Sequence, residues 1–153
     1  MTYQIQIIRD YPCKDPIGDL EAVAQAVLEH ENAAPGGLSI VLTSGEKVRE
    51  LNRRFAHIDQ ATDVLTFSDG SISPETERIY FGDITIALPI AQQQAVQAKH
   101  TLAAELALLS IHGVLHLLGH DHQETAERKH MWQIQTKIMG KFGYSFEPSE
   151  YEV

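Results

Sequence analysis

Residues 110–122 read Ser-Ile-His-Gly-Val-Leu-His-Leu-Leu-Gly-His-Asp-His, and the rest of the chain must fold around them. His112 and His116 stand four residues apart in an otherwise apolar segment. On an α-helix this spacing places both imidazoles on one face, separated by about 40° around the axis and about 6 Å along it. Because two neutral imidazoles on one face can bind the same ion, the spacing predicts a metal-bearing helix.

A catalytic zinc site needs a third protein ligand, and His122 is the candidate. A helix that simply continued would carry His122 about 280° round and roughly 15 Å along from His112. Gly119 can take the left-handed conformation that ends a helix and reverses the chain, which returns His122 towards the other two histidines. The predicted ligands are therefore His112, His116 and His122, which would hold one Zn²⁺ per chain. His120 is a competing imidazole, but it lies after the expected break.

The spacing of the three histidines is also that of the zinc proteases with the motif HExxHxxGxxH. Those enzymes carry a glutamate base directly after the first histidine, and this chain has Gly113 there. The sequence therefore predicts the metal geometry of such a protease but gives no support for peptide hydrolysis.

Three motifs together resemble the YbeY family of zinc-dependent endoribonucleases. Residues 112–122, HGVLHLLGHDH, are similar to the family signature HGxLHLxGYDH. Leu51-Asn52 and the segment 59–67, DQATDVLTF, are similar to its LN…D..TDVLSF segment, and Gly82-Asp83-Ile84 matches its GDI strand. The motifs come in the family's order and span about residues 38–140, so the resemblance covers most of the chain.

This resemblance implies a hydrolase of ester bonds: a metal-dependent endoribonuclease that cleaves single-stranded RNA in rRNA maturation and ribosome quality control. RNA, as rRNA or the ribosome, is the implied partner, and a zinc-bound water would activate phosphodiester cleavage. No residue stands out as the general acid. Two alternatives are a zinc hydrolase of another substrate and a ribosome-binding protein whose structural zinc is closed by four protein ligands.

Two positions depart from the family pattern. The family usually has a tyrosine where this chain has His120, and it usually has an RNA-handling arginine where this chain has Ala56. Arg53, Arg54 or His57 could replace that arginine, and spacing leaves the choice open.

Three aspartates are candidates for supporting the metal or positioning the substrate. Asp121 could orient a ligand histidine through its second ring nitrogen, or it could cap the turn after Gly119. Asp83 could pair with a zinc-bound histidine, or it could bond to backbone at a bulge beside Gly82. Asp63 could form a turn through its side chain, while the family resemblance suggests substrate positioning.

Composition indicates one soluble domain over residues 1–153, long enough to bury a core. We expect no membrane span and no signal peptide, and the single Cys13 cannot form an internal disulfide, so we expect a cytoplasmic protein. The net charge of −9 opposes binding to phosphates. Lys47, Arg49, Arg53 and Arg54 nevertheless cluster on one predicted helix, where they could attract phosphate or form only a solvated face.

Periodicity predicts an α+β fold, with a mixed sheet of about four strands packed with helices and the metal-bearing helix central. The expected strands cover 3–8, 38–43, 64–67 and 79–88. The expected helices cover 20–31, 45–55, 89–100, 102–118 and 123–139. Asp19, Ser44 and Thr101 are the expected N-caps, and Gly140 is the expected end of the last helix. A polar loop is expected over 68–77.

Overall fold

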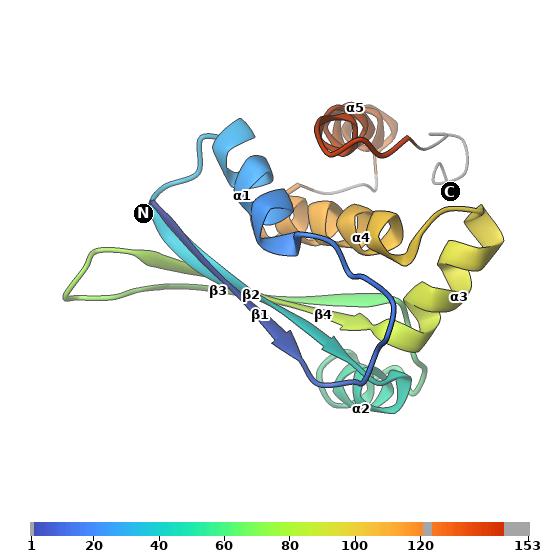
Figure 1. The fold of residues 1–153 in the computed structure, drawn as a ribbon. Helices are drawn as coiled ribbons and strands as arrows, with labels where there is room; N and C mark the ends of the chain where they lie inside the picture. The colour runs from blue at the N-terminus through green and yellow to red at the C-terminus, as the bar shows by residue number, and fades with distance from the viewer. Residues whose placement is uncertain (1, 121–123, 146–153) are drawn as a thin grey trace.

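The computed structural model describes residues 2–120 and 124–145. Within these residues the chain forms five helices and four strands, as the α+β prediction requires (Figure 1). In chain order they are β1 (Tyr3–Arg9), α1 (Leu20–His30), β2 (Gly36–Thr43), α2 (Gly45–Ala56), β3 (Val64–Ile72), β4 (Ile79–Ala87), α3 (Leu88–Ala98), α4 (Leu102–Leu117) and α5 (Thr125–Lys141).

The four strands form one mixed sheet in the order β1-β2-β4-β3. β1, β2 and β4 run parallel, and β3 pairs antiparallel with β4 at one edge. Helices α1 and α4 cover one face of this sheet, α5 lies above α4, and α2 packs on the other face (Figure 1). The mixed four-stranded sheet of the prediction is thus confirmed.

Strand register decides which side chains face which layer. Ile40 pairs with Ile84 across β2 and β4, and both are fully buried. Ser39 and Asp83 also pair, one residue earlier on each strand. Since side chains alternate along a strand, Ser39 and Asp83 point to the face opposite the α4 layer.

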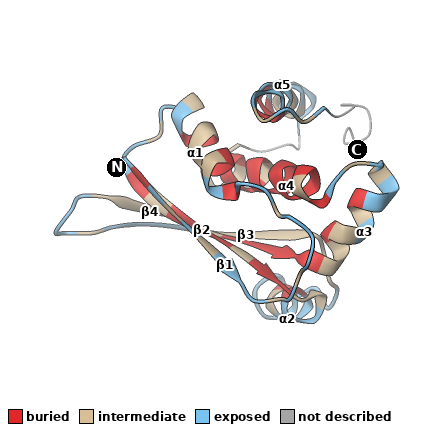
Figure 2. Ribbon diagram, in the orientation of Figure 1, coloured by how far each residue is buried: buried red, intermediate tan, exposed pale blue. Residues whose placement is uncertain are grey.

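Helix α4 is buried along most of its length (Figure 2). Its residues are apolar on nearly all sides, which is the pattern of a helix enclosed by other elements. Among the described helices none is by itself long and apolar enough to cross a membrane. Only α3 and α4 taken together pass that test, with a bend of 114° between them.

Local side-chain bonds start three helices where the sequence predicts them. Asp19 accepts a hydrogen bond from the Ala22 amide at 3.0 Å, and Ser44 accepts one from the Lys47 amide at 3.0 Å. Thr101 does the same for α4 through the Ala104 amide at 3.1 Å. These caps satisfy amides that have no partner inside their own helices, so all three predicted N-caps are confirmed.

Glu105 is a buried carboxylate in the first turn of α4. Its Oε1 lies 2.6 Å from Nε2 of His100, in the connection from α3. Burial raises the pKa of Glu105, and the histidine opposes this shift. The pair therefore ties the start of α4 to the α3–α4 corner.

Two predicted boundaries are wrong. The expected loop over 68–77 begins instead as strand, because β3 extends to Ile72 and pairs with β4 in a hairpin that projects beyond the sheet (Figure 1). Gly140, expected to end the last helix, lies inside α5, which runs to Lys141. Tertiary packing of Ile138 and Met139 outweighs the weak helix propensity of a single glycine.

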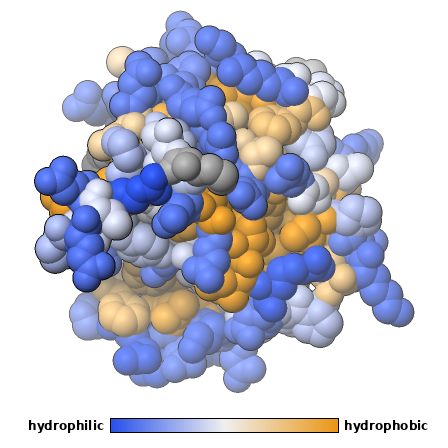
Figure 3. Space-filling view, turned by 60° about the vertical axis from the view of Figure 1, so that its left-hand side comes forward, coloured by the Kyte–Doolittle hydropathy of each residue, from blue (hydrophilic) through white to orange (hydrophobic). Residues whose placement is uncertain are grey.

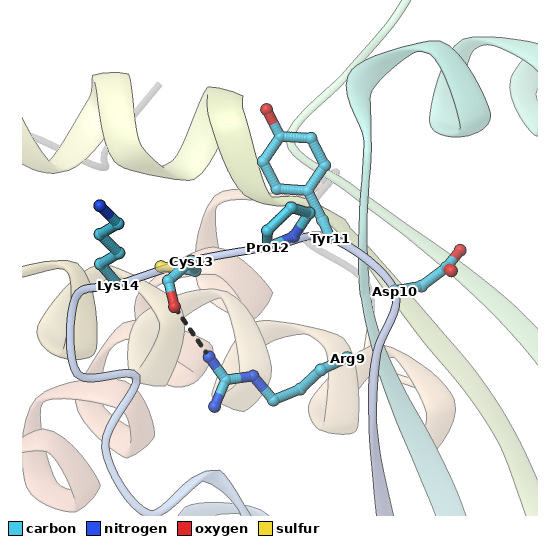
Figure 4. Close-up of a pocket in the computed structure, with 6 residues that line it drawn as sticks. All are labelled: Arg9, Asp10, Tyr11, Pro12, Cys13 and Lys14. Carbon is cyan, nitrogen blue, oxygen red and sulfur yellow. Dashed lines mark hydrogen bonds between the residues drawn. The ribbon is translucent and has the colours of Figure 1, made fainter.

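The surface has two further features. Hydrophobic side chains gather in a band across the middle of one face, between hydrophilic side chains (Figure 3). Residues 9–14, from the last residue of β1 onward, line an open pocket, where the Arg9 guanidinium donates to the Cys13 carbonyl oxygen at 3.4 Å (Figure 4). None of these six residues is a predicted site residue.

Ser110 in α4 offers a test of core packing. Its hydroxyl is fully buried and has no hydrogen-bond partner among the described residues. We expect Ser110→Ala to raise the free energy of unfolding by about 1 kcal/mol, because it removes the cost of an unsatisfied buried hydroxyl. Urea denaturation measures this change. Ser39→Ala is the matched control and should destabilise, because the Ser39 hydroxyl bonds that of Tyr80 at 2.7 Å. A loss of stability in Ser110→Ala would contradict the expectation.

Candidate functional site

The two histidines of α4 meet as their spacing predicts. Nε2 of His116 lies 2.9 Å from Nε2 of His112, and the ring centroids are 4.5 Å apart with the planes at 67°. Both side chains are half-buried on a helix that is otherwise enclosed. The two Nε2 atoms therefore converge on one point beside α4.

The helix ends as a Schellman motif. Gly119 has a φ of +96°, its amide donates to the His116 carbonyl oxygen at 3.0 Å, and the His120 amide donates to the Leu115 carbonyl oxygen at 3.0 Å. The left-handed glycine reverses the chain directly after the second histidine. The predicted break at Gly119 is thus confirmed.

The predicted third ligand, His122, and the candidate Asp121 lie outside the described residues. Among the residues that are described, no group of three or more His, Cys, Asp or Glu side chains is arranged to hold a metal ion. The ligand set His112, His116 and His122 therefore stays a prediction.

Gln135 of α5 is a site residue that sequence reasoning missed. Its side chain is buried, and its amide nitrogen lies 3.2 Å from Nδ1 of His112. The available signal was its place on the inward face of α5, because it follows Met131 by four residues and precedes Ile138 by three. A buried glutamine on an apolar face requires a polar partner, and here that partner is a histidine of the candidate site.

His120 is enclosed by carboxylates. Its Nδ1 lies 3.1 Å from Oε1 of Glu127, and its Nε2 bonds Glu31, which also bonds His30 at 2.9 Å. Burial raises the pKa of Glu31, but the hydrogen bonds from His30 and His120 outweigh this, so the net shift is downward. The two ring nitrogens of His120 thus bind the residue that caps the C-terminus of α1 and a residue of α5.

Gly113 brings α4 into direct contact with β4. A Cβ atom at position 113 would lie 2.7 Å from Cγ2 of Ile84 and 3.0 Å from its Cδ1. Such distances are far below ordinary van der Waals contact, so a side chain here requires the core to shift. This packing explains why the glutamate of the zinc proteases has no counterpart at position 113.

Asp83 is bonded by a tyrosine of its own strand. The Tyr80 hydroxyl donates to the Asp83 carboxylate and is itself bonded to Ser39, on the sheet face opposite α4. Burial, together with the bond to Asp83, raises the pKa of Tyr80. Tyr80, which stands three residues earlier on the same strand, is not among the partners predicted from the sequence, and the two predicted alternatives for Asp83 stay predictions.

The other motif residues of the resemblance hold the segment between α2 and β3. Asn52 is buried and donates to the Gln60 carbonyl oxygen at 2.9 Å, while its own carbonyl oxygen accepts from the Ile58 amide at 3.2 Å. Asp63 accepts from the Val64 amide at 2.8 Å, which agrees with local turn formation. Substrate positioning by Asp63 stays a prediction.

The basic residues of α2 are exposed. Arg49 forms two bonds to the Asp59 carboxylate, at 2.7 and 3.2 Å, and so joins the helix to the following segment. The Arg54 guanidinium lies 5.4 Å from the Phe55 ring centroid and 4.0 Å from Glu50. Arg53 points to solvent on the same helix. These cations lie on the layer below the sheet, whereas the paired histidines lie on the layer above it.

The fold and site define an α+β protein whose buried core helix carries a converging histidine pair. A sequence model described as Endoribonuclease YbeY matches residues 12–143. The Endoribonuclease YbeY of Listeria monocytogenes serotype 4a (strain HCC23) is 37% identical over 137 residues, which cover 81% of this chain and 84% of the relative. That of Gloeobacter violaceus is 36% identical over 147 residues, covering 91% of this chain and 76% of the relative. The chain belongs to the YbeY family.

A solved structure agrees with this fold. The solution structure of TM1509 from Thermotoga maritima matches with a TM-score of 0.60 and 24% sequence identity, covering 91% of each chain. At this identity the likeness shows the fold alone.

Gly113→Ala tests the close approach of α4 to β4. We expect the free energy of unfolding to fall by about 1–3 kcal/mol, because the added methyl group overpacks against Ile84. Gly140→Ala is the matched control: it is also a helical glycine, but no atom of the described residues lies within 4 Å of the position that a Cβ would take there. That control should gain up to about 1 kcal/mol from helix propensity. Equal effects of the two substitutions in urea denaturation would refute the packing argument.

Gly119→Ala tests the chain reversal. Among the residues that the structure describes, nothing lies within 4 Å of a Cβ at this position, so the expected cost comes from the backbone at a φ of +96°. We expect a loss of about 1–2 kcal/mol. Gly119→Asn should lose less, because asparagine tolerates the left-handed region. Thermal unfolding of both variants gives the comparison, and an alanine variant as stable as the wild type would contradict it.

Proposed function

We propose that this chain is a zinc-dependent endoribonuclease that cleaves single-stranded RNA. Its membership of the YbeY family, whose curated relatives are named Endoribonuclease YbeY, supports a hydrolytic nuclease acting in rRNA processing. The observation that carries the metal part is the convergence of Nε2 of His112 and His116 at 2.9 Å on the buried helix α4.

The donor chemistry of the site fits zinc. Two ligands at Zn–N distances of 2.0–2.1 Å and a tetrahedral angle stand about 3.3 Å apart, close to the separation observed here. Neutral imidazole nitrogens are ligands that zinc favours. His112, His116 and His122 would hold the ion, and their neutral rings would leave it a net charge of +2.

Gln135 supplies the support that a metal-binding histidine requires. A histidine that binds a metal through Nε2 carries its proton on Nδ1 and donates it to an acceptor. The Gln135 amide lies at that Nδ1 of His112, and turning its amide by 180° presents the oxygen as the acceptor. We propose that Gln135 fixes the tautomer and the orientation of His112.

When bound, zinc lowers the pKa of a coordinated water to about 7 and stabilises negative charge at a phosphoryl group. The rings of His112 and His116 that would hold the zinc are half-buried on α4. We further propose that the activity serves rRNA maturation and ribosome quality control in the cytoplasm, with the ribosome as partner.

His116→Ala tests the proposed function. We expect the wild type to retain about one zinc per chain after purification and to cleave single-stranded RNA, because zinc sites of this class use three protein ligands. The variant should lose both properties. Elemental analysis and cleavage of a labelled RNA by zinc-supplied protein measure them.

His130→Ala is the matched control, since this exposed histidine of α5 lies outside the ligand set. It should retain both the metal and the activity. Equal RNA cleavage by wild type and His116→Ala would identify a contaminating nuclease. Wild-type protein free of any transition metal would refute the metal site.

A further inference from the structure

Phe55, at the C-terminal end of α2, is a large aromatic side chain held in an exposed position. It is 62% exposed. Its ring meets Phe67 of β3 edge to face, with centroids 5.6 Å apart and planes at 71°. The Arg54 guanidinium lies 5.4 Å from the same ring centroid. These two contacts restrict the ring to one position and leave most of its surface to solvent.

The charge around Phe55 is opposite to that of the whole chain. Helix α2 carries four cations, Lys47, Arg49, Arg53 and Arg54, against two anions, Glu46 and Glu50, while the chain has a net charge of −9. Arg49 is bound to Asp59. Arg54 lies 4.0 Å from Glu50, which is a long distance for an ion pair, and its side chain is 56% exposed. The last turn of α2 thus carries two exposed guanidinium groups, of which Arg54 lies beside one exposed aromatic ring.

We infer that Phe55 is a stacking platform for a base of single-stranded RNA, with Arg53 and Arg54 binding the flanking phosphates. This inference rests on the proposed function. Exposed aromatic rings beside cations are the usual means of binding single strands, because every base has a π-face and every linkage carries a charge. Ala56 provides no charge at the next position, so the two arginines before Phe55 supply it.

The platform and the paired histidines lie on opposite faces of the sheet, and α2 and α4 both contact the edge strand β3. Phe67, which contacts Phe55, belongs to the edge strand β3. Gly82 of β4 lies between Phe67 and α4. A Cβ atom added to Gly82 would lie 2.1 Å from the Phe67 carbonyl oxygen and 3.0 Å from Cδ2 of Leu117. Leu117 directly follows His116 on α4. An RNA strand bound at the Phe55 platform would therefore have to cross the edge strand β3 to reach the histidine pair on the other face of the sheet.

Equilibrium binding of a labelled single-stranded RNA, followed by fluorescence anisotropy, tests this inference. We expect Phe55→Leu, which retains apolar bulk but no π-face, to weaken binding by about 5- to 150-fold, the range for loss of one stacked base. Phe55→Trp should bind as well as the wild type or better. Val96→Ala is the matched control, because Val96 is 78% exposed on α3 and should leave the affinity unchanged.

An RNA with one abasic site at successive positions separates stacking from folding defects. At the stacked position the loss of the base should abolish the difference between wild type and Phe55→Leu, since both then bind through phosphates alone. Phe55→Trp adds a spectroscopic test, because a stacked indole should be quenched by RNA, whereas Val96→Trp should not.

The outcomes distinguish this inference from the proposed function. Equal affinities of wild type and Phe55→Leu for every RNA would overturn the inference and leave RNA cleavage by the wild type intact. Binding that depends on Phe55 without any cleavage would support the platform and refute the nuclease. A Phe55→Leu defect that persists at every abasic position would show a structural role and would overturn the inference.

Discussion

The contact between Gly113 and Ile84 sets the position of helix α4, and much of the site follows from it. Because position 113 has no side chain, α4 lies directly on β4. Each residue of a helix is rotated by 100° from the one before it. Once one residue is held against the sheet, the directions of all the remaining side chains are therefore fixed. His112 and His116 are therefore aimed by a packing contact to which neither of them contributes.

The sheet separates two kinds of chemistry. Its inner face is apolar, carries α1 and α4, and supports the histidine pair. Its outer face carries the bonded group Ser39, Tyr80 and Asp83, and α2 with its cations covers part of it. Since residues alternate between these faces with period 2, the single strand β4 serves both, through Ile84 on one side and Asp83 on the other. The edge strand β3 contacts both α2 and α4, one on each face.

Local chemistry was predictable from the sequence, and distant pairing was not. The caps at Asp19, Ser44 and Thr101 and the left-handed turn at Gly119 depend on residues within a few positions of each other. The extension of β3 to Ile72 depends on pairing with β4, which residues 68–72 do not reveal by themselves. The polar residues of this segment predict a loop, because strand formation depends on the partner strand more than on the segment's own residues.

The same distinction holds at the site. The spacing of His112 and His116 is a local property of a helix, so their convergence was predictable. Gln135 reaches His112 from another helix. Tyr80 donates a hydrogen bond to Asp83 across the irregularity of their strand near Gly82. Such partners depend on which layers meet. A polar residue on an apolar stripe indicates that a partner exists without identifying it.

The spacing of the histidines therefore predicts a metal site more specifically than it predicts which reaction the site catalyses. In a zinc protease the residue after the first histidine is a glutamate that acts as the base. In this chain that direction is filled by Ile84, so the sheet occupies the place where the base would stand. Any group that moves a proton must approach from the side that the sheet leaves open. The packing at position 113 therefore gives no support to peptide hydrolysis, and it does not by itself select another substrate, because the 2′-hydroxyl of an RNA would need a base just as an attacking water does.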